Sequence, residues 1–171
     1  MTVRLVWDKS ECILEIGKLK INAAPRSYPP FTCQAIVEEQ DTNLLLGEQT
    51  TLNDPGKPAW YLANTMEDSD SYPLGSVVLK GNFPINMLAV VHDIDQEITC
   101  SQDSVSRAYR EIMKIVRERK LVSLALPLLG TIHGRLSVNE SIQLLRTGTL
   151  HGFPESLERL WLILPAGSNC N

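Results

Sequence analysis

The sequence predicts an α/β protein in which a mixed sheet is covered by helices on both sides. Residues 121–129 are almost continuously apolar, which is typical of a strand buried on both faces. Apolar residues recur with helical spacing over residues 101–120, directly before that run. Because helix and strand patterns continue to alternate toward the end of the chain, this half favours a sheet covered by helices.

The composition indicates one core and no extended basic surface. With 171 residues, 43% of them hydrophobic, we expect a single domain over residues 1–171. A formal net charge of −4 without a basic stripe argues against nucleic-acid binding, because phosphate contacts need clustered Lys and Arg. No stretch approaches the roughly 18 consecutive apolar residues of a membrane span, and the first residues hold no apolar signal region. We therefore expect a cytoplasmic protein without a membrane partner.

The cysteines are far apart, and none forms a C-x-x-C pair. This spacing predicts buried, reduced thiols rather than a zinc or redox site, so we expect no metal and no cofactor. The four residues are Cys12, Cys33, Cys100 and Cys170.

The first part of the chain predicts strands at residues 3–7 and 12–21, joined as a hairpin. Residues 22–30 contain three prolines, which lack the N–H that a central strand needs, and are expected to form a loop. A further strand is expected at residues 31–37.

A polar cluster follows that strand: Glu38, Glu39, Gln40 and Asp41. Carboxylates placed where a strand stops can bind a metal ion or act as acid and base. A solvated strand end is the alternative interpretation.

The middle of the chain predicts a short helix at residues 59–66 and strands at residues 75–81 and 86–95. The second of these strands becomes polar at His92, which is followed by Asp93. A histidine beside acids is either a general base or a structural, hydrogen-bonded side chain.

The helix over residues 101–120 has Ser101 as its expected N-cap and basic residues in its last turn. A second helix is expected at residues 137–146 and a last strand at residues 160–164.

The loop between the apolar strand and the second helix is a candidate anion site, and we call it the 130–134 loop. Its glycines can take positive φ, so that several N–H groups can point the same way, and it is expected to be exposed. Ligands of open α/β sheets lie at this end of the strands. An ordinary strand-to-helix turn is the alternative. The loop residues are Gly130, Thr131, Ile132, His133 and Gly134.

The order of these pieces resembles the macro domains, three-layer α/β/α sandwiches of which many bind ADP-ribose and some remove ADP-ribose or a phosphate from it. The resemblance is best in residues 73–95, in the helix over residues 101–120, and in the strand SLALPLLG with the loop that follows it. It implies that the 130–134 loop is the second phosphate loop of such a domain, with Ile132 where a glycine is common.

The first half resembles the family in outline but differs from it at residues that would contact a ligand. EIGKLKI is similar to the strand in which the family has Gly-Asp-Ile, and Lys18 stands where an aspartate would contact adenine. QAIVEEQD is similar to a segment with two asparagines, which Glu38 and Asp41 replace. Gly47 remains where many members have a glycine-rich first loop.

Three functions follow from the resemblance. The first is a domain that binds a nucleotide or ADP-ribose-type small molecule through Gly47 and the 130–134 loop. The second is an ADP-ribosyl or ADP-ribose phosphate hydrolase, with Glu38, Asp41 or His92 as the catalytic candidates. The third is a degenerate domain used for protein association. We rank the three in this order. Because carboxylates beside a diphosphate repel it, ADP-ribose itself is not assumed to be the ligand, and the oligomeric state stays open.

Overall fold

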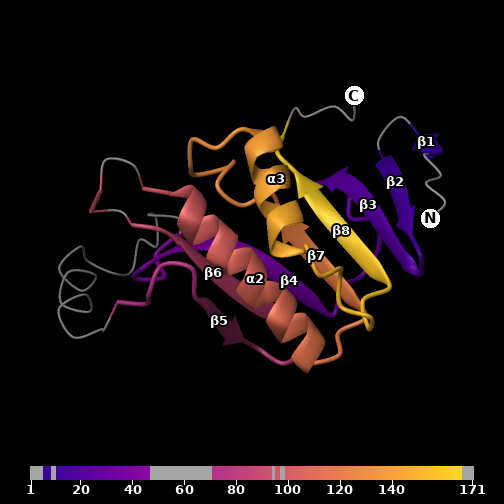
Figure 1. Ribbon diagram of the computed structural model, residues 1–171, viewed down its shortest axis with the longest axis horizontal. Coiled ribbons are helices and arrows are strands. Elements are labelled where there is room, and N and C mark those ends of the chain that lie inside the picture. The colour runs from indigo at the N-terminus through magenta and orange to yellow at the C-terminus, as the bar shows by residue number, and fades with distance from the viewer. Residues whose placement is uncertain (1–5, 9–10, 47–70, 94, 97–98, 167–171) are drawn as a thin grey trace, which may run out of the picture.

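The computed structural model describes residues 6–8, 11–46, 71–93, 95–96 and 99–166 (Figure 1). Its centre is one eight-stranded sheet with the order β1-β2-β3-β8-β7-β4-β6-β5. Helices α2 (Gln102–Glu118) and α3 (Val138–Gly148) lie side by side over one face of this sheet. The strands are β1 (Val6–Asp8), β2 (Glu11–Ile16), β3 (Leu19–Pro25), β4 (Ala35–Asp41), β5 (Val77–Lys80), β6 (Ile85–His92), β7 (Ser123–Pro127) and β8 (Arg159–Leu164).

The sheet is mixed, and its middle is parallel. Strands β3, β8, β7, β4 and β6 run in one direction, while β1, β2 and β5 form antiparallel pairs at the two edges. The carboxyl ends of the five parallel strands therefore lie together at one end of the sheet, which we call the carboxyl edge. Open α/β sheets place their ligands at this end. The predicted α/β class with a mixed sheet is confirmed.

Both described helices begin where the sequence predicts. The Ser101 side chain accepts the Ser104 N–H at the start of α2. Ser137 and Glu140 form a reciprocal capping box at the start of α3. Among the described residues, no helix combines the length and apolar character that crossing a bilayer requires.

The apolar strand β7 is buried throughout, as its composition predicts. Since side chains alternate across a strand, Leu124 and Leu126 join the main core beneath the helices, whereas Ala125 joins a smaller cluster on the opposite face. Trp161 belongs to that smaller cluster and donates its indole N–H to the Ala24 carbonyl at 3.1 Å.

The prediction of one strand at residues 12–21 followed by a loop at residues 22–30 is wrong. The chain turns at Gly17, which has a φ of 61°, and residues 22–25 continue β3. Pro25 is tolerated because it is the last residue of β3, where a missing N–H interrupts no further pairing.

This turn also overturns the role expected for Lys18. The residue lies between β2 and β3, at the amino end of β3. The pocket described below lies at the carboxyl ends of the parallel strands, whereas Lys18 lies at their amino ends. Lys18 therefore cannot contact a nucleotide base in that pocket.

The prediction of a strand at residues 31–37 is also displaced. Strand β4 spans Ala35–Asp41, so the polar cluster is part of a central strand rather than a solvated end. Glu39, Gln40 and Asp41 are buried there. The helix expected at residues 59–66 lies outside the described residues.

Candidate functional site

A pocket of about 140 Å³ opens at the carboxyl edge of the sheet. It lies where β3, β4 and β7 end beside the 130–134 loop. This volume is below the roughly 300–1,000 Å³ of sites that enclose a drug-sized ligand, so the pocket can enclose only part of a nucleotide. Its lining consists of Arg26, Val37, Glu38, Glu39, Pro127, Ile132 and His133.

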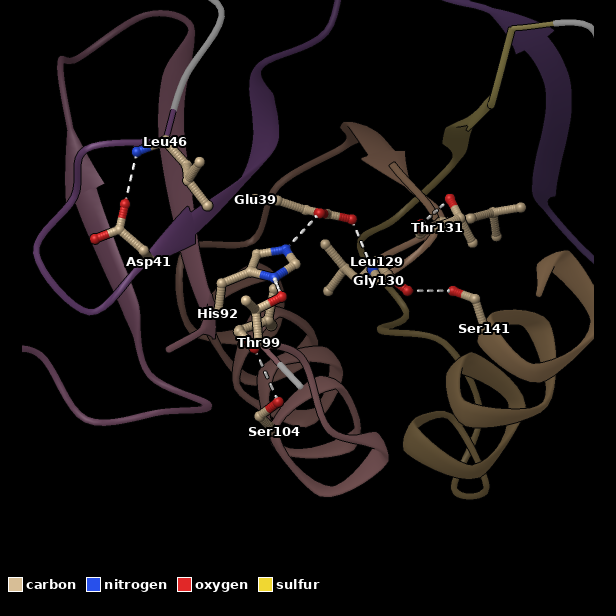
Figure 2. Close-up of polar contacts among 12 residues, drawn as sticks. Glu39, Asp41, Leu46, His92, Thr99, Ser104, Leu129, Gly130, Thr131 and Ser141 are labelled. Atoms are coloured by element: carbon tan, nitrogen blue, oxygen red, sulfur yellow. Dashed lines mark hydrogen bonds and ion pairs between the residues drawn. The ribbon is translucent and has the colours of Figure 1, made fainter. Parts of the chain in front are cut away.

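Glu39 bridges three parts of the chain beneath this pocket (Figure 2). Its Oε1 accepts the Gly130 N–H at 2.6 Å, and its Oε2 lies 2.8 Å from His92 Nε2. The Glu39 and His92 side chains are only 2% and 1% exposed. The carboxylate thus takes one backbone donor at the start of the 130–134 loop.

His92 is held at both ring nitrogens. Because the Glu39 carboxylate accepts, His92 Nε2 carries a proton and donates it to Oε2. His92 Nδ1 lies 3.3 Å from the Thr99 hydroxyl oxygen. The buried imidazole therefore serves as a structural link between β6 and β4, and it does not present a free base to the pocket.

Asp41 ends β4 and has no exposed surface. Its Oδ1 accepts the Asn43 N–H at 2.6 Å, and its Oδ2 accepts the N–H groups of Leu45 and Leu46 at 2.8 and 2.7 Å. Figure 2 shows the bond to Leu46. The carboxylate of Asp41 thus satisfies three backbone N–H groups of the turn that follows β4.

Glu38 points to the other face of β4 and reaches the pocket. Its side chain is 30% exposed and lies 3.5 Å from an Arg26 terminal nitrogen. Arg26 directly follows β3, so the pair joins the ends of two strands across the pocket. An ion pair this exposed is weak, at about 0–1 kcal/mol.

The 130–134 loop is buried at its start and exposed at its tip, so the expectation of a uniformly exposed loop is wrong. Gly130 is buried with a φ of 82°, and a Cβ there would lie 2.6 Å from Leu136 Cδ1. Ile132 is 52% exposed, and His133 is exposed as well. Within the described part of the chain, the N–H groups of Ile132, His133 and Gly134 donate to no acceptor.

A buried polar network anchors the start of this loop to both helices. The Tyr109 hydroxyl accepts the Leu129 N–H at 2.8 Å, and Ser141 Oγ donates to the Leu129 carbonyl at 2.8 Å. The two hydroxyl oxygens are 2.8 Å apart. Burial raises the pKa of Tyr109, which keeps its hydroxyl protonated.

Cys100 lies next to this site but has the wrong chemistry for a nucleophile. Burial, together with the nearby charge of Glu39, raises its thiol pKa to about 12, against a smaller lowering by the Ser104 hydrogen bond. The thiolate that nucleophilic attack requires is therefore scarce at neutral pH.

The structure separates the candidate residues into three groups. Glu38 and the 130–134 loop tip lie at the pocket, while Asp41 and His92 are buried and engaged in hydrogen bonds. Gly47 lies outside the described residues. Among the residues that are described, no three His, Cys, Asp or Glu side chains gather as a metal site would require.

Sequence reasoning missed the roles of Glu39 and Arg26. Alternation along β4 places Glu39 on the same face as Ala35 and Val37, which the core buries completely. That spacing was a signal that Glu39 is buried and needs a partner. No comparable signal marks Arg26, because its neighbour Glu38 comes from another strand.

The sequence matches no protein-family model and no curated protein. Solved structures do match it. The Oceanobacillus iheyensis macrodomain with ADP is 16% identical, covers 92% of this chain and 90% of its own, and gives a TM-score of 0.66. A mutant of that macrodomain with ADPR, also 16% identical, gives 0.65 over 91% and 90% of the two chains.

A Trypanosoma brucei macrodomain in complex with ADP is 15% identical and gives a TM-score of 0.59, over 84% of this chain and 63% of its own. At such identities the likeness shows architecture rather than ligand. The protein has the macrodomain fold.

Proposed function

We propose that the chain is a binding module for a phosphorylated nucleoside of the ADP-ribose type, and that it does not hydrolyse its ligand. The observation that carries the proposal is the pocket at the carboxyl edge, which the tip of the 130–134 loop borders with N–H groups that have no acceptor in the described chain. Backbone N–H groups of this kind are donors for phosphate oxygens. Arg26 adds a cation at the same pocket.

The charges around the pocket are compatible with an anionic ligand. Glu38 is paired with Arg26, and Glu39 is paired with His92 and also bonded to Gly130. Each carboxylate of the lining thus has a positive or N–H partner, so the repulsion expected from the sequence is reduced. The fold supports the same ligand class, since similar structures were solved with ADP and ADPR.

Two of the three catalytic candidates are excluded on geometric grounds, and the third, Glu38, is tested by the assay for product release described below. A general base must lie within hydrogen-bond reach of the water that it activates. Asp41 has no exposed surface, and His92 is bound at both nitrogens. Glu38 is the one remaining candidate among those the sequence suggests, and it is engaged with Arg26.

Isothermal titration calorimetry with ADP-ribose tests the proposal. We expect binding, and we expect Arg26→Gln to weaken it roughly tenfold, or about 1.4 kcal/mol, because a charged donor to phosphate is lost. Lys80→Gln is the control, since it removes an exposed cation from edge strand β5 and should leave the affinity unchanged. Absence of binding by the unmodified protein would refute the proposal, and so would release of product from ADP-ribosylated protein at pH 7.

A further inference from the structure

We infer that His133 is a binding residue of the pocket, and that its protonated imidazole is a second cation for the phosphate of the ligand, beside Arg26. The inference rests on the proposed function and adds a regulation to the same site, because an imidazole changes its charge between about pH 5 and about pH 8. The pocket should therefore bind its anionic ligand more tightly as the pH falls through this range.

The His133 side chain lies at the pocket and is exposed. Its ring centroid is 6.0 Å from that of His92, with an angle of 84° between the two rings. Neither ring nitrogen of His133 has a hydrogen-bond partner within the described part of the chain. The imidazole can therefore gain a proton and contact a ligand without losing a hydrogen bond that the fold uses.

The other two histidines of the chain do not offer this chemistry. His92 has no exposed surface, and its ring nitrogens lie beside Glu39 and Thr99. His151 is exposed, but it follows α3, which leads from the 130–134 loop back toward the start of β8. It therefore lies toward the amino ends of the parallel strands, away from the pocket, and is a matched control for His133.

The charges around His133 favour an anion only when its ring is protonated. One guanidinium and two carboxylates leave the described pocket lining with one excess negative charge while the imidazoles are neutral. A proton on His133 cancels this excess. Burial raises the pKa of the nearby Cys100 thiol to about 12, so this thiol adds no charge. The titratable and charged groups around the ring are Arg26 after β3, Glu38 and Glu39 of β4, His92 of β6, Cys100 before α2, and Arg135 on the same loop.

The loop backbone brings a phosphate within reach of this ring. The N–H groups of Ile132 and His133 have no acceptor in the described chain, and both residues line the pocket. One of these donors thus belongs to the residue that carries the imidazole. A phosphate oxygen that accepts these N–H groups can also accept from the protonated ring, and such charge-assisted bonds are roughly twice as strong as neutral ones.

The test is calorimetry of the full chain with ADP-ribose at about pH 8 and at about pH 6, the range in which an imidazole gains its proton. ADP-ribose is suitable because its linked phosphates keep a constant charge over this range. We expect the affinity to rise roughly tenfold toward the lower pH, the effect of one charged hydrogen bond. By linkage, binding must also take up protons, which is measured by comparing buffers of different ionisation enthalpy.

His133→Gln keeps a polar side chain at the pocket but cannot gain a charge. This variant should bind ADP-ribose equally at both pH values, without proton uptake, and with the affinity that the unmodified protein shows at the higher pH. His151→Gln removes an exposed histidine from the other end of the sheet and should keep the pH dependence of the unmodified protein.

Binding of ADP-ribose by the unmodified protein without proton uptake would overturn this inference and leave the proposed function standing. A pH dependence that survives in His133→Gln would do the same, because it would come from another group. Failure of ADP-ribose to bind at both pH values would overturn the inference together with the proposed function.

Discussion

At the scale of single residues, Gly130 shows how closely the 130–134 loop is tied to the core. Its φ of 82° is unfavourable for any residue with a side chain, and a Cβ added there would lie 2.6 Å from Leu136 Cδ1 and 3.3 Å from Cys100 Sγ. The glycine is therefore needed for packing as well as for the backbone turn. Loss of ligand binding after its substitution would not by itself identify a phosphate site.

Gly130→Ala is predicted to destabilise the protein by about 2–5 kcal/mol, of which about 1–2 is left-handed strain and about 1–3 is overpacking. Gly152→Ala is the matched control, because Gly152 has a φ of 86° and nothing within 4 Å of a new Cβ. It should lose only the strain component. Urea unfolding measures both, and equal losses in the two variants would contradict the packing argument.

At the scale of elements, α3 depends on its capping box. The Ser137 N–H and hydroxyl donate to Glu140 Oε2 at 2.8 and 2.7 Å, and the Glu140 N–H donates to Ser137 Oγ at 3.2 Å. The two bonds that Ser137 donates to the carboxylate lower the pKa of the Glu140 carboxyl, the bond from the Ser137 backbone most of all. The first turn of α3 follows the 130–134 loop, so the box also stabilises the loop's far end.

This lowered pKa predicts a pH dependence. Because the folded pKa lies below the ordinary value of 4.5, the contribution of Glu140 is present above that pH and disappears as the pH falls through the folded value. Glu140→Gln should be less stable than the unmodified protein at neutral pH. In acid, the difference in stability between the two proteins should become smaller. Thermal unfolding across this range, with exposed Glu155→Gln as control, measures it. A difference that widens in acid would contradict the assignment.

At the scale of the whole molecule, the Glu39 carboxylate joins segments that are far apart in the chain. It connects β4 to the end of β6 through His92, and to the loop after β7 through Gly130. A buried pair of this kind is costly to break, since removing one partner leaves the other desolvated and uncompensated. The candidate site therefore shares its central residue with the framework that holds the sheet and the loop together.

Glu39→Ala is predicted to cost about 3–5 kcal/mol of folding free energy. Glu39→Gln should cost less, because its amide oxygen can still accept the Gly130 N–H and His92 can change tautomer. Glu38→Ala, one residue earlier and paired near the surface, should cost about 0–1 kcal/mol. Urea unfolding of the three variants checks this order, and similar losses for the two alanine variants would rule out a special role for Glu39.

The sequence by itself determined the second half of the fold. The helices over residues 102–118 and 138–148, and strands β6, β7 and β8, lie where local periodicity and N-cap residues predict them. These signals suffice because the apolar residues of each element follow the spacing of a helix or a strand, and because residues close in the sequence mark where the element ends. The resemblance to the macro domains rested mainly on this half, and the fold confirms it.

Tertiary structure alone decided the chemistry of the site. Glu39 and Gly130 are 91 positions apart, so no local pattern could show that a carboxylate would take the loop's first N–H. The polar end of β4 resembled a solvated terminus because its partners come from β6, the loop after β7 and the turn after β4 itself. Burial of a charge depends on partners that only the folded chain supplies, and for that reason the acidic residues could be located from the sequence while their roles could not.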